Sequence, residues 1–414
     1  MLRDLMGRNL PRVKEVNQFL IREKIYRCGP VSRINVAESL GLTLPTITTN
    51  VNRMLSDGLI HEIEDTGSRK KLRRHTMLVD IAPESRLYLG IEIRRGFRTA
   101  VIVDLRGNVL AKASDFNRIN RYEDALENAA LLAKSVMSEK NLDVSGISSV
   151  GICAPGLVDS DAGVLISLLG YVWKDKPIVR DFSELTGFGS DMIVVDNNVI
   201  ARAFGLSMFN HNLIKDADSF AYMYVSTGIG CPLLRDVSEH FGVVVGEGEV
   251  GHMVMNPDGP LCACGNQGCL GVYSSELSML ERSVKAVKEG RAPVLKGLCD
   301  GKTENITMEL VMEAMEKGDS DIRDMLEEAV RYLGLAIANI DNFVKPGCVV
   351  IESRYFGYKE YRDLLMEWID RNLYRRSSIN SRFVFRPYDE YGGARGAAAL
   401  AVKSNLESEM DSGE

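Results

Sequence analysis

The chain of 414 residues is 45% hydrophobic and 26% charged, which is ordinary for a soluble globular protein of two or three domains. Residues 1–30 carry charges throughout, and no stretch approaches the roughly 18 apolar residues of a membrane helix, so neither a signal peptide nor a membrane partner is expected. Residues 1–75 contain 14 Lys or Arg and 8 Asp or Glu, a net charge of +6, although the whole chain carries −7. A basic N-terminal segment followed by an acidic remainder predicts a nucleic-acid-binding module joined to a domain with another function.

Three helices are expected at the basic end. Residues 12–24 have a one-sided apolar pattern that ends before Gly29-Pro30. Ser32 is a favourable cap for a second helix ending at Gly41, and Thr43 caps a third helix. This spacing predicts a helix–turn–helix. The polar residues left on the outer face of the third helix can hydrogen-bond base edges or phosphates, and they are Thr46, Thr48, Thr49, Asn52 and Arg53.

A hairpin is expected directly after the third helix. Residues 59–64 alternate like a strand, residues 66–68 turn, and residues 71–78 return. Its tip carries five basic residues suited to DNA contact, namely Arg69, Lys70, Lys71, Arg73 and Arg74. We interpret residues 1–82 as a winged helix–turn–helix DNA-binding domain. A small helical protein-interaction module with a solvated charge run is the alternative.

From Pro83 onward the pattern becomes that of an α/β protein. Strands are expected near residues 89–93, 99–104, 109–113, 150–154 and 192–196, with helices over residues 122–140 and 198–209. The second half repeats this plan, with strands at 220–226 and 349–351, a long helix over 325–342, and a closing helix of small residues from 391. Thr227-Gly228-Ile229-Gly230 is a turn whose amides are able to cradle an oxyanion.

Two α/β lobes with a cleft between them are the natural assembly. We expect residues 83–198, completed by 385–404, to form the first lobe and residues 199–384 to form the second. Residues 405–414 are expected to be a disordered tail.

A cluster of metal-binding residue types lies in the second lobe. Cys262, Cys264 and Cys269 fall within eight residues, and His252 lies ten residues before the first of them. Three thiolates and an imidazole suit tetrahedral Zn²⁺, which would fix a loop that has few apolar residues. We predict one structural zinc ion per chain. Reduced cysteines without a metal, or a disulfide, are the alternatives. The other five cysteines are scattered, which favours a reducing cytoplasm.

The chain resembles the ROK family (repressors, open reading frames and sugar kinases) over residues 2–404. The resemblance rests on Gly248-Glu249-Val250-Gly251-His252, on the following Cys262-x-Cys264-Gly265-x-x-Gly268-Cys269-Leu270, and on Ala154-Pro155-Gly156-Leu157-Val158-Asp159. It implies an actin-like (ribonuclease H-like) fold of two lobes, with zinc held by His252 and the three cysteines. The N-terminal module matches the branch of xylose, glucose and N-acetylglucosamine repressors.

The resemblance also implies that the kinase motifs of the family are altered here. Glu92-Ile93-Arg94-Arg95-Gly96 stands where kinases have Asp-x-Gly-Gly-Thr, and Glu352-Ser353 replaces a Gly-Gly beside the nucleotide. Asn198 replaces the aspartate that acts as general base, and an amide cannot accept that proton. General-base catalysis contributes about 10²–10⁴-fold in rate. Because Thr227-Gly228-Ile229-Gly230 alone remains of the phosphate elements, we expect no enzymatic activity and no catalytic residues.

In the family the cleft binds a sugar. Carried over to this chain, the binding residues are Asn197, Asn198, Glu249 and His252. A further family glutamate is replaced by Gly271, which should weaken or redirect sugar recognition. The alternative is that the remaining polar residues only support the zinc loop. Trp173 is either a stacking platform at the cleft mouth or a core residue.

These features predict a sugar-responsive DNA-binding transcriptional regulator, a repressor acting in carbohydrate metabolism. Its expected partners are operator DNA, a sugar or sugar phosphate as effector, and further copies of the chain in a homodimer or tetramer. One helix–turn–helix reads too few bases for genomic specificity, so two-fold pairing is expected. An active sugar kinase, and a regulator controlled by a partner protein rather than by a sugar, are the alternatives.

Overall fold

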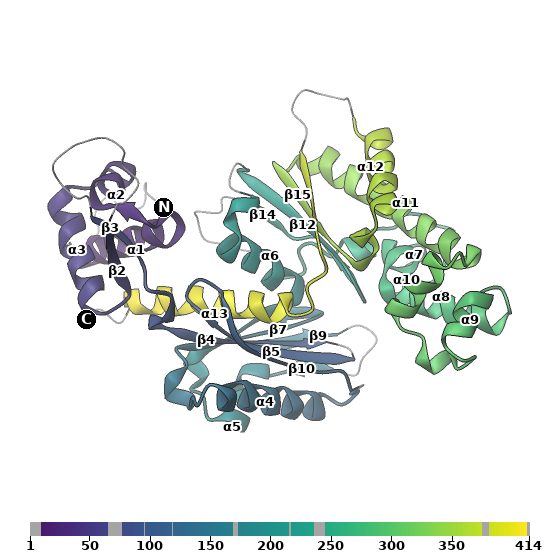
Figure 1. Cartoon of the computed structure of the whole chain (residues 1–414), viewed down its shortest axis with the longest axis horizontal. Helices are drawn as coiled ribbons and strands as arrows, with labels where there is room; N and C mark the ends of the chain where they lie inside the picture. Colours follow the sequence, from purple (N-terminus) through teal and green to yellow (C-terminus); the bar gives the residue numbers. More distant parts are fainter. Residues whose placement is uncertain are drawn as a thin grey trace.

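The computed structural model of the chain describes residues 10–64, 77–94, 96–117, 119–168, 173–214, 217–235, 245–374 and 381–411. A small N-terminal unit lies beside two α/β lobes, and a long C-terminal helix runs between the lobes towards that unit (Figure 1). Among these residues, no helix is long and apolar enough to cross a lipid bilayer.

The N-terminal unit contains three helices and a small antiparallel sheet. Ser32 and Thr43 accept hydrogen bonds from the backbone N–H groups of Asn35 and Thr46, and Gly41 ends the second helix with φ of 64°. The expected caps are therefore confirmed. The helices are α1 (Leu10–Cys28), α2 (Arg33–Leu40) and α3 (Leu44–Ser56), and the sheet has the order β1 (Val31–Ser32), β3 (Met77–Ile81), β2 (Ile60–Glu64).

The first lobe is built on a five-stranded mixed sheet. Its central strand β4 is almost wholly buried, as expected of a strand covered on both faces. The strand order is β11 (Ile193–Asn197), β7 (Ser149–Ala154), β4 (Leu87–Arg94), β5 (Phe97–Asp104), β6 (Val109–Asp115), with β11, β7 and β4 parallel. Helices α4 (Tyr122–Glu139) and α5 (Ile178–Thr186) cover one face (Figure 1). A small sheet of β8 (Leu157–Asp159), β9 (Val164–Ser167) and β10 (Lys174–Lys176) adjoins it.

The second lobe has a sheet in the order β13 (Ile229–Gly230), β12 (Ser219–Val225), β15 (Cys348–Glu352), β16 (Arg382–Arg386), and β14 (Leu233–Arg235) also pairs with β12. The long helix α11 (Ser320–Val344) buries an apolar stripe in the core of this lobe. The remaining helices are α7 (Leu270–Ser274), α8 (Glu276–Lys288), α9 (Pro293–Leu298), α10 (Met308–Glu316) and α12 (Lys359–Asn372).

Two helices, α6 (Asn198–Phe209) and α13 (Gly392–Asp411), lie between the sheets and pack on each other (Figure 1). A β-carbon placed on Gly396 would lie 2.2 Å from the backbone oxygen of Ala201, and one on Gly205 would lie 2.8 Å from the α-carbon of Gly396. The two backbones are therefore in direct contact, which only glycine permits at this crossing. The expectation of a closing helix packed through small residues is confirmed.

Helix α13 also reaches the N-terminal unit. The hydroxyl of Tyr88 donates to Oδ1 of Asn405 at 2.9 Å, and Arg22 of α1 donates to the carbonyl oxygen of Leu406. Residues 405–411 are helical, so the expectation of a disordered tail from residue 405 is wrong for this segment, while residues 412–414 lie outside the described residues. The helix continues because its last turns have partners on α1 and β4.

Candidate functional site

The predicted metal ligands come together at one point of the second lobe. The candidate ligand atoms of His252, Cys262, Cys264 and Cys269 all lie within 4.8 Å of one another. Sγ of Cys264 is 3.7 Å from Sγ of Cys269, and Sγ of Cys262 is 3.6 Å from Nδ1 of His252. The sequence spacing thus identified four side chains that converge in space.

The loop that carries these cysteines is held by backbone hydrogen bonds and by glycines. The N–H of Cys262 donates to the carbonyl oxygen of Asn266 at 2.7 Å, and the N–H of Leu270 donates to that of Met253 at 2.8 Å. Gly268 has φ of 65°, and a β-carbon there would lie 1.5 Å from the backbone oxygen of Asn256. Only glycine fits this turn, so the loop presents its thiols without an apolar core of its own.

The cluster fits a tetrahedral metal ion. Two sulfur ligands at about 2.3 Å from zinc are about 3.8 Å apart, and a sulfur and an imidazole nitrogen are about 3.5 Å apart. The distances above match both values. A hydrogen bond from the backbone of Asn266 lowers the pKa of Cys264, whereas burial raises the pKa of Cys269 to about 12. A cation is what would keep the second thiol deprotonated.

The predicted sugar-binding amides lie where β11 meets α6. Asn197 caps α6 by accepting from the N–H of Val199 at 2.8 Å, and its Nδ2 donates to the carbonyl oxygen of Gly156 at 2.9 Å. Asn198 is buried, and its Nδ2 lies 3.4 Å from Oε1 of Glu92. Both amides therefore have partners inside the protein as well as a position at the edge of the first sheet.

Glu249 and His252 belong to a segment of the second lobe that contacts β13. A β-carbon on Gly251 would lie 2.7 Å from the backbone oxygen of Ile229 in β13, and one on Gly230 of β13 would lie 2.9 Å from Cγ2 of Val199. Strand β13 thus touches both the start of α6 and the segment that ends at His252. Glu249 is exposed, yet surrounding protein desolvates its carboxyl group and raises its pKa, while His252 lowers it.

A buried charge network, which the sequence pattern did not reveal, lies between the lobes. Arg202 of α6 donates to Oε2 of Glu92 at 3.0 Å and to Oε1 of Glu352 at 2.8 Å. Arg94 donates to the hydroxyl of Tyr224 at 3.0 Å and to Oγ of Ser226. The available signal was a set of charged residues inside apolar runs, at the ends of β4 and β15 and within α6.

The glycine turn after β12 already has partners within the protein. Ser226, which precedes this turn, donates from Oγ to Oε2 of Glu276 at 2.9 Å and accepts from Arg94. Arg354 in turn donates to Oε1 of Glu276 at 2.8 Å. Glu276 and Arg94 therefore already occupy the hydroxyl of Ser226 beside this turn. Gly228 itself is exposed.

Trp173 belongs to the core of the first lobe. Its side chain is buried, its Nε1 donates to the carbonyl oxygen of Asn120 at 2.8 Å, and its ring meets that of Tyr122 edge to face at a centroid distance of 5.8 Å. Of the two readings of Trp173, the structure supports the core residue.

The predicted DNA-contacting residues of α3 lie on its outer side. Thr49, Asn52 and Arg53 are exposed, whereas Thr46 and Thr48 are half-buried. The hydroxyl of Thr49 donates to the carbonyl oxygen of Pro45 at 3.0 Å, so this hydroxyl already has a partner within the helix. The five basic residues predicted at the hairpin tip, Arg69, Lys70, Lys71, Arg73 and Arg74, lie outside the described residues.

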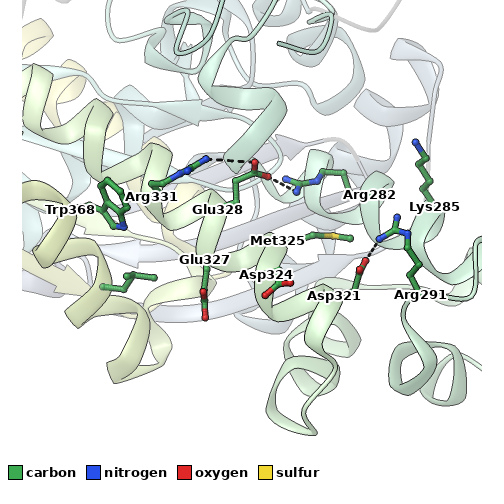
Figure 2. Close-up of a pocket in the computed structure, with 11 residues that line it drawn as sticks. Arg282, Lys285, Arg291, Asp321, Asp324, Met325, Glu327, Glu328, Arg331 and Trp368 are labelled. Carbon is green, nitrogen blue, oxygen red and sulfur yellow. Dashed lines mark hydrogen bonds and ion pairs between the residues drawn. The ribbon is translucent and has the colours of Figure 1, made fainter. Parts of the chain in front are cut away.

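A separate surface cavity of about 720 Å³ lies among α8, α11 and α12 and contains none of the predicted site residues (Figure 2). Its charged residues are largely paired with one another. Arg282 lies 2.6 Å from Glu328, which also contacts Arg331, and Arg291 contacts Asp321. This cavity does not lie beside the predicted effector residues.

The comparisons with known proteins place the chain in a family. The sequence profile of the ROK family matches residues 88–404. The chain belongs to the ROK family. It is 25% identical over 349 residues to the xylose repressor of Bacillus subtilis (strain 168), covering 82% of this chain and 83% of that one. It is 26% identical over 353 residues to the DNA-binding transcriptional dual regulator NagC of Escherichia coli (strain K12), covering 83% and 81%.

Solved structures of ROK proteins confirm the two-lobed actin-like fold. A ROK family transcriptional regulator, a homologue of the E. coli MLC protein, superposes with a TM-score of 0.77 at 23% identity, covering 96% of this chain and 99% of that one. A ROK family glucokinase from Streptomyces griseus, solved with glucose and AMPPNP, gives 0.64 at 23% identity and covers 77% of this chain and 99% of that one. The first match therefore extends over the N-terminal unit as well.

Proposed function

We propose that the protein is a sugar-responsive DNA-binding transcriptional regulator of the ROK family. Helix α13 carries this proposal, because it begins beside the buried charges between the lobes and ends on α1 of the N-terminal unit. A β-carbon on Gly393, near its start, would lie 2.1 Å from the carboxylate of Glu92. A change in the lobes is thereby passed to the N-terminal unit through one continuous helix. The names of the repressor relatives support the same function.

The N-terminal unit is proposed to bind operator DNA as a winged helix–turn–helix. Asn52 and Arg53 are exposed on α3, where they suit base edges and phosphates in the major groove. The basic residues 69–74 supply further phosphate contacts. Two copies of the chain in a homodimer would present two such units to a two-fold symmetric operator.

The effector is proposed to be a sugar or sugar phosphate that binds around β13. The segments that carry Asn198 and Glu249 contact this strand through the neighbouring residues Val199 and Gly251, so a ligand held between these segments would stabilise one arrangement of the lobes over another. His252 belongs to the same segment and to the metal cluster. The side-chain oxygen of Asn197 is used in the helix cap, and its side-chain nitrogen is used in the bond to Gly156. This observation favours a second candidate function, a regulator that responds to a partner protein instead of a sugar.

The cluster of His252 and the three cysteines is proposed to hold one zinc ion with a structural role. Four protein ligands complete a tetrahedral site and leave no open position for a reacting water. Bound zinc would neutralise the thiolates and fix the loop that leads into α7. The residues of this chain hold that loop through the backbone bonds of Cys262 and Leu270.

We also propose that the cleft has no phosphotransferase activity. The amide of Asn198 cannot take a proton from a sugar hydroxyl, and its Nδ2 faces Glu92. Arg94 and Glu276 both contact Ser226 beside the glycine turn. Hexose-dependent release of ADP by the purified protein, abolished on altering Asn198, would contradict this proposal.

The proposed function is tested by operator selection from random DNA, repeated with and without a panel of monosaccharides and their phosphates. A regulator of this kind selects a two-fold symmetric site, and one member of the panel changes its affinity for that site. A thermal-shift screen of the same panel separates a sugar effector from a partner protein. A ligand at about 100 times its dissociation constant adds roughly 2.7 kcal/mol to the free energy of unfolding.

A further inference from the structure

The ends of the central strands of the two sheets are joined by a single guanidinium group. Glu92 lies near the end of β4 in the first lobe, Glu352 ends β15 in the second, and Arg202 donates to both. The three side chains are at most 2% exposed. Removing either carboxylate would leave the buried Arg202 cation with only one of its two carboxylate partners.

Arg94 makes a second connection across the lobes. It extends from the end of β4 in the first lobe and donates to Tyr224 and Ser226 at the end of β12 in the second, and to the hydroxyl of Tyr388 at 3.1 Å. Burial alone would lower the pKa of Arg94, but Tyr224 and Glu92 raise it above its usual value. Arg94 therefore remains a cation in the absence of any bound anion.

The network balances its own charge. The carboxylates of Glu92, Glu276 and Glu352, together with the more exposed Glu309, face an equal number of guanidinium groups, those of Arg94, Arg202, Arg354 and Arg386. No added phosphate or metal is required to neutralise it. The guanidinium plane of Arg354 also lies 3.7 Å from the ring centroid of Tyr388, which adds a cation–π contact.

We propose that this network is an interlobe lock, which holds the lobes at one fixed angle when no ligand is bound. The lock also occupies the position beside the glycine turn where an external anion would otherwise bridge the lobes. The lock goes beyond the proposed function, because it acts without an effector or DNA. Packed ionic contacts have discrete arrangements. Loss of one pair is therefore expected to let the angle between the lobes vary widely, instead of shifting it slightly.

The test measures the distance between two spin labels, one on each lobe, by pulsed electron resonance on the full-length protein. Glu127 of α4 and Asp370 of α12 are exposed and are changed to cysteine for labelling, with exposed Cys28 changed to serine. The lock predicts one narrow distance distribution without ligand. Glu352→Gln keeps the shape of the side chain but removes its charge, and it is expected to widen the distribution at least two-fold.

The matched control is Asp341→Asn. Asp341 is as buried as Glu352, but it contacts Lys345 and Ser381 inside the second lobe alone. This variant should keep the narrow distribution of the parent protein. If Glu352→Gln does not fold, Tyr388→Phe removes one hydroxyl of the network and leaves every charge in place, and it too should widen the distribution.

Three outcomes would overturn the lock. The first is a broad distribution in the parent protein. The second is a folded Glu352→Gln or Tyr388→Phe protein that keeps the narrow distribution. The third is tight binding of Mg-ATP by the parent protein in calorimetry, because the position beside Ser226 would then be open to an external phosphate. None of these measurements involves a sugar or DNA, so failure of the lock and failure of the proposed regulator are distinguishable.

Discussion

Nδ2 of Asn198 lies 3.4 Å from Oε1 of Glu92, and both side chains are buried. Asn198 is thus the neighbour of a buried carboxylate that Arg202 also contacts. An amide is compatible with this position because it donates to Glu92, whereas a second carboxylate would face it.

An aspartate at position 198 is therefore expected to damage the protein without conferring catalysis. Asn198→Asp places two carboxylates side by side in a buried site, so one must bind a proton or the pair must separate. We expect a loss of several kcal/mol in the free energy of unfolding at pH 7, a smaller loss at acid pH, and no hexose-dependent ADP release. Chemical denaturation at two pH values and a coupled kinase assay measure these effects. Asn197→Asp is the control, because aspartate is also a good helix cap, so this variant loses only the bond from Nδ2 to Gly156 and should cost less than Asn198→Asp. Equal losses in both variants would contradict the argument.

Removal of the metal is expected to destabilise the second lobe. The purified chain should contain about one zinc ion, and Cys264→Ser should lose it, together with a lower unfolding temperature. Metal analysis and thermal unfolding with and without a chelator test this. Cys28→Ser is the control, since Cys28 is exposed and lies outside the cluster. Metal-free protein with unchanged stability would contradict the proposed structural zinc ion.

The outer side of α3 is expected to contact operator DNA. Arg53→Ala should weaken binding and reduce the slope of log affinity against log salt by about 0.9, the value of one phosphate contact. Replacement of the five basic residues within 69–74 should flatten the slope further. Lys288→Ala removes an equal charge from an exposed position of α8 and should change neither quantity. The measurement is operator binding across a range of salt concentrations, and an unchanged slope in both N-terminal variants would exclude these contacts.

The crossing of α6 and α13 is expected to tolerate no side chain. In Gly396→Ala the new β-carbon would approach the backbone oxygen of Ala201, so the helices must separate. Overpacking of this kind costs about 1–3 kcal/mol. Gly297 lies within α9 with open space around it, so Gly297→Ala should instead stabilise the protein by up to about 1 kcal/mol. Opposite shifts in the denaturation midpoint are the expected result, and matching shifts would show that the crossing is loose.

The last turns of α13 are expected to support the N-terminal unit. Ending the chain after residue 404 removes the contacts of Asn405 with Tyr88 and of Leu406 with Arg22. We expect faster amide exchange in α1 and weaker operator binding, while the zinc content stays unchanged. Exchange that increases equally in the second lobe would show a global effect instead. Hydrogen exchange with mass spectrometry distinguishes the two.

Local signals predicted most elements and the metal cluster. These signals depend on residues that are close together in the sequence. They are the caps Ser32 and Thr43, the apolar runs of the strands, and the close spacing of Cys262 to Cys269. The charge network does not depend on such residues. Glu92, Arg202 and Glu352 are 110 and 150 residues apart along the chain, and only the packing of α6 between two sheets brings them together.

The same limit explains the error at the C-terminus. The polar composition of residues 405–411 is typical of a tail, and their helical state depends on contacts with α1, nearly four hundred residues earlier in the chain. Composition alone cannot show such a partner.

The core beneath α1 is completed by Ala398, Ala401 and Val402 of α13. Because α1 precedes these residues in the chain, the ribosome makes α1 first. Until α13 has been made, Ile21 and Ile25 therefore lack part of the apolar surface that covers them in the folded protein. A polypeptide in which α13 has not yet been made therefore carries its N-terminal unit with an incompletely covered core, so the operator binding proposed for this unit depends on the helix that packs beneath α1.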